Sequence, residues 1–154
     1  MGHLCACFYT YAAKLAALTK ERRMTERKKV VLVDFDGTLN SYKSGFDGKR
    51  PQHLPDSPNP GAIGWLRRVY ATSVYEPVIF TTRVLNQATG EDDPFVVEAI
   101  RDWLINYGLE KMVVHNLRIT AKKVPCSLLV DDRAFRYEGK FPDPAEMTKL
   151  TSRG

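Results

Sequence analysis

The sequence predicts an α/β fold built on a mainly parallel sheet. Three short apolar segments are typical of strands buried on both faces of such a sheet, and they cover residues 30–33, 78–80 and 127–130. Each is followed directly by polar side chains, starting with Asp34, Thr81 and Asp131. Because ligands bind at the carboxyl ends of the strands in open α/β sheets, we expect functional residues at these three positions.

The first connection between strands contains a helix, which we expect near residues 60–72. Asn59 is a residue type favoured at the N-cap, and Pro60 suits the first turn. An apolar stripe at helical spacing follows, formed by Ile63, Leu66, Val69 and Tyr70. The pattern predicts an amphipathic helix that links the first two strands.

A second helix is expected to begin at Asp93-Pro94, which repeats the same capping pattern. Its apolar positions have helical spacing and are Val96, Val97, Ile100, Trp103, Leu104 and Tyr107. Gly108 is then a typical stop signal. Residues 112–114 are expected to form a further strand, after which the chain leads into the last one. This order of elements is typical of a Rossmann-like three-layer sandwich.

The end of the first strand carries two carboxylates one residue apart, Asp34 and Asp36. Side chains alternate along a strand, so both carboxylates point to the same side, and Gly37 allows the backbone to turn sharply after them. An Asp-x-Asp-Gly sequence on its own is also common in ordinary turns. The polar ends of the two later strands favour a functional site instead, and two adjacent anions there require a cation.

The polar residues occur in an order that resembles the haloacid dehalogenase-like (HAD) phosphatase superfamily. The matching residues are Asp34, Asp36 and Thr38, then Thr81, then Lys123, then Asp131 and Asp132. The resemblance covers residues 30–135. Receiver domains use similar groups, but their acidic pair comes first. Neither gap in which this family places a cap domain is long enough to hold one, so the chain resembles a small capless member.

The resemblance implies a phosphatase that forms an aspartyl-phosphate. Asp34 would attack the phosphorus, and Asp36 would protonate the leaving oxygen and later deprotonate water. Thr81 and Lys123 would meet the negative charge on the phosphoryl oxygens. Lys122 remains an alternative to Lys123.

The implied cofactor is Mg²⁺. Four carboxylates would converge, and they belong to Asp34, Asp36, Asp131 and Asp132. Each close pair would repel by about 4 kcal/mol at an effective dielectric constant near 20, which a divalent ion makes tolerable. Mg²⁺ prefers a few carboxylates together with water and substrate phosphate. Asp34 with one or both of Asp131 and Asp132 would therefore suffice, and the resemblance implies that Asp36 contributes its backbone carbonyl.

The substrate is expected to be a phosphate monoester, such as a nucleotide, a polynucleotide end or another phosphorylated molecule. Four residues are expected to bind it, namely Gly37, Thr38, Thr82 and Arg83. Arg83 and Arg133 would either hold a second anionic group or form ion pairs at the rim. The alternative is a non-catalytic HAD-like module that binds a nucleotide or a partner protein.

The segment between the first motif and the first helix, here called loop 40–59, is polar and rich in Gly and Pro. Long loops without secondary structure of their own are usually functional or disordered. We expect it to fold over the site as a flap. Its substrate contacts would be Tyr42, Lys43, Phe46, Lys49 and Arg50.

Most of the positive charge lies in the first 29 residues. The 154-residue chain has a formal net charge of +5. Residues 1–29 hold seven basic and two acidic residues, which leaves residues 30–154 neutral overall. We expect a basic extension at 1–29, helical or disordered, and a catalytic domain at 30–154. Either translation starts at Met24 and residues 1–23 lie upstream of the start, or the extension is a basic arm that contacts nucleic acid or a partner.

Two features of composition indicate a cytoplasmic protein without membrane contact. The three cysteines give no disulfide framework, as expected in a reducing compartment. The apolar stretch at residues 4–18 is too short to span a bilayer.

Overall fold

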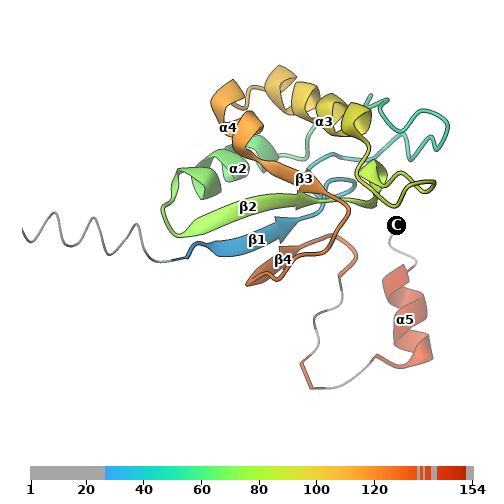
Figure 1. Ribbon diagram of the computed structural model, residues 1–154. Coiled ribbons are helices and arrows are strands. Elements are labelled where there is room, and N and C mark those ends of the chain that lie inside the picture. Colours follow the sequence, from blue (N-terminus) through green and yellow to red (C-terminus); the bar gives the residue numbers. More distant parts are fainter. Residues whose placement is uncertain (1–26, 135, 137, 140–141, 152–154) are drawn as a thin grey trace, which may run out of the picture.

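A four-stranded parallel sheet forms the centre of the molecule (Figure 1). The computed structural model describes residues 27–134, 136, 138–139 and 142–151. The strands are β1 (Lys29–Val33), β2 (Tyr75–Phe80), β3 (Arg118–Thr120) and β4 (Leu128–Val130), in the spatial order β3-β2-β1-β4. Every neighbouring pair runs parallel, which confirms the predicted α/β class and the parallel sheet.

β1 has an interior position in this sheet, with β2 on one side and β4 on the other. Val33 pairs with Ile79 of β2 and with Val130 of β4. The pairing with β4 continues past the strand, because the Asp34 N–H donates to the Val130 carbonyl over 2.9 Å. The residues that follow β1, β2 and β4 therefore leave the sheet side by side at its carboxyl edge.

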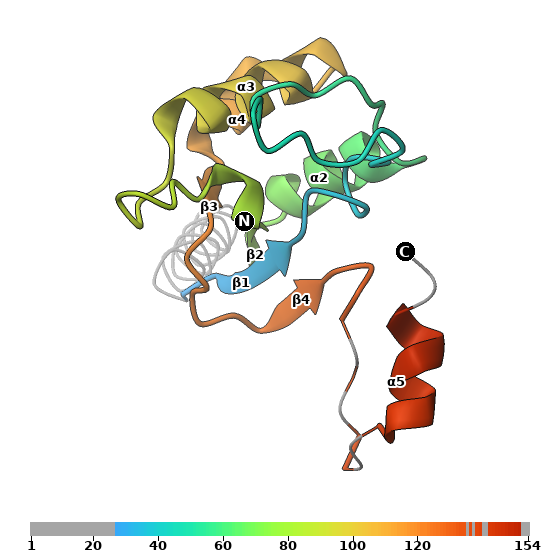
Figure 2. The same cartoon turned by 90° about the vertical axis from the view of Figure 1, so that its right-hand side faces the viewer.

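Among the described residues, three helices cover one face of the sheet (Figure 2). They are α2 (Ala62–Ala71), α3 (Pro94–Asn106) and α4 (Lys111–Asn116). The connections from β1 to β2 and from β2 to β3 step in the same direction across the sheet, so right-handed crossovers place their helices on the same side. The core between helices and sheet includes Val33, Phe35, Leu66, Ile79, Ile100, Leu104, Val114 and Ile119.

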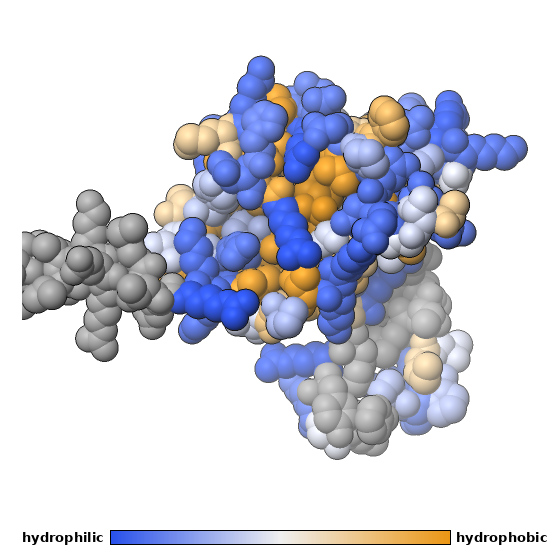
Figure 3. All heavy atoms as spheres, in the orientation of Figure 1, coloured by the Kyte–Doolittle hydropathy of each residue, from blue (hydrophilic) through white to orange (hydrophobic). Residues whose placement is uncertain are grey.

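The opposite face of the sheet has no helix over it in the part of the chain that the structure describes. Residues 121–127 connect β3 to β4 across the sheet without forming a helix. α5 (Pro144–Thr151) stands apart from the sheet, beyond β4 (Figures 1 and 2). Figure 3 shows the side of the molecule seen in Figure 1, where apolar atoms are visible among charged side chains between the helices and the sheet. The second helical layer of a three-layer sandwich is thus not found in this part of the chain.

The strand predicted at residues 112–114 is wrong, because these residues belong to helix α4. The buried side chains of Leu109, Val113 and Leu117 recur every fourth residue, which is the spacing of one helical face. An apolar run as short as this one does not distinguish a strand from a buried helical turn. The strand follows at once, since β3 begins at Arg118.

The two predicted helix starts have different outcomes. α3 begins as predicted, and the side chain of Asp93 accepts a hydrogen bond from the Phe95 N–H over 2.9 Å. In α2, Gly61 (φ 83°) has the N-cap position that the sequence predicted for Asn59. The side chain of Asn59 bonds instead to the turn that follows β1.

The predicted basic extension lies almost entirely outside the described residues, which begin at Arg27. Its helical or disordered state and its contact with nucleic acid stay predictions. β1 begins at Lys29, beside the predicted domain boundary. Within the described ranges, no helix has the length and apolar character needed to cross a membrane.

Candidate active site

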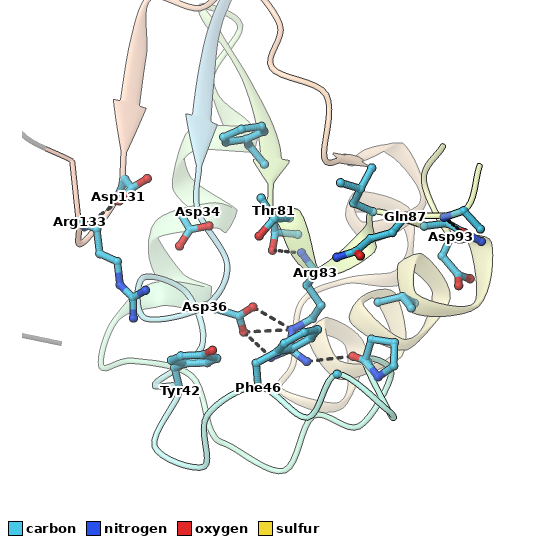
Figure 4. A pocket seen from close by; sticks show the side chains of 18 residues that line it. Asp34, Asp36, Tyr42, Phe46, Thr81, Arg83, Gln87, Asp93, Asp131 and Arg133 are labelled. Carbon is cyan, nitrogen blue, oxygen red and sulfur yellow. Dashed lines mark hydrogen bonds and ion pairs between the residues drawn. The ribbon is translucent and has the colours of Figure 1, made fainter. Parts of the chain in front are cut away.

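One pocket of about 800 Å³ lies at the carboxyl edge of the sheet (Figure 4). The ends of β1, β2 and β4 deliver polar residues to it, and loop 40–59 contributes to its wall. Its charged and hydroxyl residues include Asp34, Asp36, Thr81, Arg83, Asp131 and Arg133. The structure therefore brings the ends of three parallel strands together, although Asp131 lies about a hundred residues after Asp34 in the sequence.

Asp34 is the first residue after β1, and its carboxyl group is half-buried in the pocket. Burial raises the pKa of Asp34 to about 7, and the negative charges of Asp131, Asp36 and Asp132 act in the same direction. A hydrogen bond from the Phe35 backbone opposes this rise. Because the charged form is disfavoured by both burial and its neighbours, a cation beside Asp34 would be strongly attracted.

Asp36 forms an ion pair with Arg83 inside the pocket (Figure 4). The Arg83 Nε–H donates to Oδ2 of Asp36 over 2.8 Å and to Oδ1 over 3.1 Å, and Nη2 donates to Oδ1 over 2.8 Å. Two-pronged pairs of this kind fix the orientation of both groups. The side chain of Arg83 is only 2% exposed, so it lies inside the pocket wall and not at the rim.

Arg83 also holds loop 40–59 against the site. Its Nη1 donates to the carbonyl of Pro51 over 2.9 Å, and its guanidinium carbon lies 4.9 Å from the centre of the Phe46 ring. Thr81 turns the chain so that this contact is possible, because its hydroxyl accepts a hydrogen bond from the Arg83 N–H over 3.2 Å at the start of a short 3₁₀ turn. One buried side chain thereby links β2, Asp36 and the loop.

Gly37 and Thr38 lie against Asp132. Neither is among the described residues that line the pocket. The Asp132 N–H donates to the Thr38 hydroxyl over 3.0 Å, and that hydroxyl lies 3.4 Å from Oδ1 of Asp132. A Cβ atom on Gly37 would lie 2.5 Å from Oδ2 of Asp132. These residues join the turn after β1 to the residues after β4. Their predicted role in substrate binding stays a prediction.

Asn59 supports the same turn from the other side, a role that the sequence interpretation missed. Its side-chain amide donates to the Gly37 carbonyl over 2.8 Å and to the Thr38 carbonyl over 3.0 Å. The sequence near Asn59 gives no signal for this contact. An Asn before a Pro is typical of a helix N-cap, and that is how the sequence was interpreted.

Neither of the two candidate lysines is among the described residues that line the pocket. Lys122 forms an ion pair with Glu91, and the side chain of Lys123 is exposed. Thr82, Arg83 and Arg133 do line it. The structure thus does not bring Lys123 to Asp34, and the positive charge in the pocket wall comes from arginines.

Three of the four predicted metal-site carboxylates have other partners. Asp36 is paired with Arg83, Oδ1 of Asp132 lies near the Thr38 hydroxyl, and Oδ1 of Asp131 accepts from a backbone N–H. Among the described residues, no three His, Cys, Asp or Glu side chains are gathered closely enough to hold a metal ion by themselves. Asp34 and Asp131 remain as neighbouring carboxylates in the pocket. Two carboxylates plus water and phosphate oxygens are a donor set that suits Mg²⁺, so the residues present fit this ion.

Arg133 lies at the edge of the acidic end of the pocket (Figure 4). Its backbone N–H donates to Oδ1 of Asp131 over 2.7 Å, which orients that carboxylate. Its guanidinium carbon lies 5.9 Å from the centre of the Tyr42 ring. The loop residues Tyr42 and Phe46 line the pocket, whereas Lys43, Lys49 and Arg50 are not among its described lining residues. The contacts of the loop with substrate stay a prediction.

Comparison with protein-family models, with curated proteins and with solved structures finds no match to this chain.

Proposed function

We propose that this chain is a Mg²⁺-dependent, HAD-like phosphatase that hydrolyses a phosphate monoester through an aspartyl-phosphate. The observation that supports it best is the position of Asp34, a half-buried carboxylate at the end of an interior strand with Thr81 and Asp131 in the same pocket. A Rossmann-like HAD core without a cap domain is part of the same proposal.

In the first step, an oxygen of Asp34 forms a bond to phosphorus and the bond to the leaving oxygen breaks. Asp36 donates the proton that the leaving oxygen needs. Both oxygens of Asp36 accept hydrogen bonds from Arg83, so we expect Arg83 to release at least one of them before proton transfer. Arg83 is therefore a positioning residue that sets where the Asp36 carboxyl points.

In the second step, a water molecule attacks the phosphorus of the aspartyl-phosphate. Asp36 accepts a proton from that water, the bond between phosphorus and the Asp34 oxygen breaks, and inorganic phosphate leaves. The enzyme returns to its starting state with Asp36 protonated. The same carboxyl thus acts as acid and then as base.

Charge on the phosphoryl oxygens needs fixed donors. The Thr81 hydroxyl accepts from the Arg83 N–H, which leaves its own proton available for a phosphoryl oxygen. Mg²⁺, held by Asp34 and Asp131, would supply positive charge next to the phosphoryl group. Lys123 keeps its proposed role only if the segment at residues 121–127 moves toward the pocket when substrate binds.

A second candidate function is a non-catalytic HAD-like module that binds a nucleotide or a partner. The ion pair of Asp36 with Arg83 favours it, because a carboxylate held in this way is a poor proton donor. It is also favoured because neither Lys122 nor Lys123 is among the described residues that line the pocket.

Phosphate release decides between the two functions. The substrates are glycerol phosphate, nucleoside monophosphates and oligonucleotides with a 5′ or 3′ phosphate, each with Mg²⁺ and with EDTA. The enzyme is tested as wild type, as Asp34→Asn, and as Asp102→Asn, in which the carboxylate changed is exposed on α3.

Turnover that needs Mg²⁺ and is lost only in Asp34→Asn supports the phosphatase. Turnover that persists in Asp34→Asn refutes the proposed nucleophile. A folded wild-type protein that releases no phosphate but binds nucleotide, measured by calorimetry, supports the binding module.

A further inference from the structure

Two aromatic side chains of loop 40–59 line the pocket beside its carboxylates. Tyr42 and Phe46 lie next to Asp36 (Figure 4). The Phe46 side chain is 50% exposed. A ring this open to water in the wall of the pocket is accessible to a ligand.

The ring of Phe46 is held in place without being buried. The guanidinium of Arg83 lies 4.9 Å from its centre. Arg83 is in turn fixed by its hydrogen bonds to Asp36 and to the Pro51 carbonyl. A ring held in advance of binding loses little freedom when a flat ligand stacks on it.

The direction of the Tyr42 side chain is set by an unusual backbone conformation. Its φ angle is 55°. Residues with bulky side chains rarely adopt a positive φ. Its N–H donates to Oδ1 of the buried Asn40 over 3.0 Å, which fixes this conformation. Backbone strain at a ligand site is typical of a residue whose side chain must face one direction.

The charges in the pocket argue against a second anionic group on the substrate. Arg83 is neutralised by Asp36. Arg133 lies 3.7 Å from Oδ2 of Asp132, and among the described lining residues these two arginines carry the positive charge. The part of the substrate that lies inside the pocket next to the reacting phosphate is therefore expected to be neutral.

The size and polarity of the pocket suit a flat group with a polar edge. Its volume of about 800 Å³ is far more than one phosphate needs and lies in the range of small-molecule sites. The side-chain amide of Gln87 points toward the pocket (Figure 4). An amide offers both a donor and an acceptor, which is what the edge of a nucleobase requires.

We propose that Tyr42 and Phe46 form a stacking surface for a nucleobase, so that the substrate is a phosphate monoester on a nucleoside. This inference rests on the proposed function and narrows its substrate. The nucleobase belongs either to a free nucleotide or to the terminal nucleotide of a strand, since both present the same face to an aromatic ring.

The test compares Tyr42→Leu and Phe46→Leu with wild type, because leucine keeps an apolar side chain but removes the ring. The control is Phe95→Leu, which removes a ring that is 81% exposed on α3, outside the pocket. We measure kcat/KM for a nucleoside monophosphate and for glycerol phosphate, which has no base. The ratio of the two should fall about tenfold in each loop variant, mainly through KM, and should not change in Phe95→Leu.

A second readout does not depend on turnover. Asp34→Asn should bind a nucleoside monophosphate in the calorimeter, and adding Tyr42→Leu should weaken that binding about tenfold. An oligonucleotide end bound more tightly than the mononucleotide assigns the site to strand ends. An oligonucleotide end bound more weakly than the mononucleotide assigns it to free nucleotides.

Three results would overturn the inference while leaving the phosphatase intact. Wild type could cleave glycerol phosphate as well as it cleaves nucleotides. Phenyl phosphate could be as good a substrate as a nucleotide, which would point to any flat group. The loop variants could lower both rates equally, which would mean that the rings act only through Arg83. If no substrate is turned over and Asp34→Asn binds no nucleotide, both proposals fail.

Discussion

The guanidinium of Arg83 and the carboxylate of Asp36 form a buried ion pair, with 2.8 Å between Nη2 and Oδ1. The two residues are separated by 47 positions in the sequence. The pair joins the turn after β1 to the turn after β2, and it also carries the contacts that hold loop 40–59. Its removal should therefore affect both stability and the site.

Arg83→Met is expected to destabilise the fold by about 3 kcal/mol, because it leaves the Asp36 charge in the pocket without its partner. The double variant Arg83→Met/Asp36→Asn should recover part of this loss, since no unpaired charge remains. Urea unfolding measures both. Equal stability of the single and double variants would show that the ion pair contributes little beyond packing.

Gly37→Ala should destabilise the protein by about 2–4 kcal/mol. The positive φ of 91° strains any side chain, and a Cβ atom would lie 2.5 Å from Oδ2 of Asp132. Gly90→Ala is the matched control, because its φ is 71° and its Cβ atom would meet nothing within 4 Å. The difference between their losses of unfolding free energy measures the cost of the contact with Asp132. If both variants lose the same stability, the contact has no energetic weight.

Asp34→Asn is expected to stabilise the metal-free protein above neutral pH. Burial raises the pKa of Asp34 from 3.8 to about 7. Between these values the folded state binds more protons than the unfolded state, so this carboxyl lowers stability as pH rises through that range. The group is partly open to solvent, so we expect a gain of about 1–2 kcal/mol at pH 8.

The measurement is urea unfolding of both proteins in EDTA at pH 8 and at pH 4. The difference in unfolding free energy between Asp34→Asn and wild type should be smaller at pH 4 than at pH 8. An advantage of the same size at both pH values would mean that it comes from the amide itself and not from the titration of Asp34.

Mg²⁺ should raise the melting temperature of the wild type, and EDTA should reverse the change. At ten times the dissociation constant the gain is about 1.4 kcal/mol, or roughly 3–5 °C for a domain of this size. Asp131→Asn should abolish the shift, because Asp131 lines the pocket beside Asp34. Asp132→Asn should keep most of it, because the Asp132 carboxylate lies near the Thr38 hydroxyl and Asp132 is not among the described residues that line the pocket. If Asp132→Asn abolishes the shift and Asp131→Asn keeps it, the ion is held by Asp132.

The sequence predicts β1, β2 and β4, the α3 cap and the residues at the ends of these strands, because they depend on local signals, but it places the remaining strand at residues 112–114 and misses β3. Asp34, Thr81 and Asp131 each follow an apolar run directly, and a parallel sheet must bring such positions to one edge. The α4 helix was missed because two valines fit either a helix or a strand.

Contacts between distant segments could not be predicted in this way. Nothing near Arg83 in the sequence indicates that it turns back to Asp36, since the partner is chosen by the fold. The same holds for the Asn59 side chain, which bonds to Gly37 and not to its own helix. Lys123 fits the residue order on which the sequence resemblance rests, yet it is not among the described residues that line the pocket.

The interior position of β1 determines when the site can assemble. Val31 of β1 pairs with Leu128 of β4, and we expect contacts between such distant segments to form late, because a long stretch of chain must close first. β1, α2 and β2 are neighbours in sequence and can associate earlier. A partly folded chain would then hold Asp34 and Thr81 without Asp131. We therefore expect no phosphatase activity until β4 has joined the sheet.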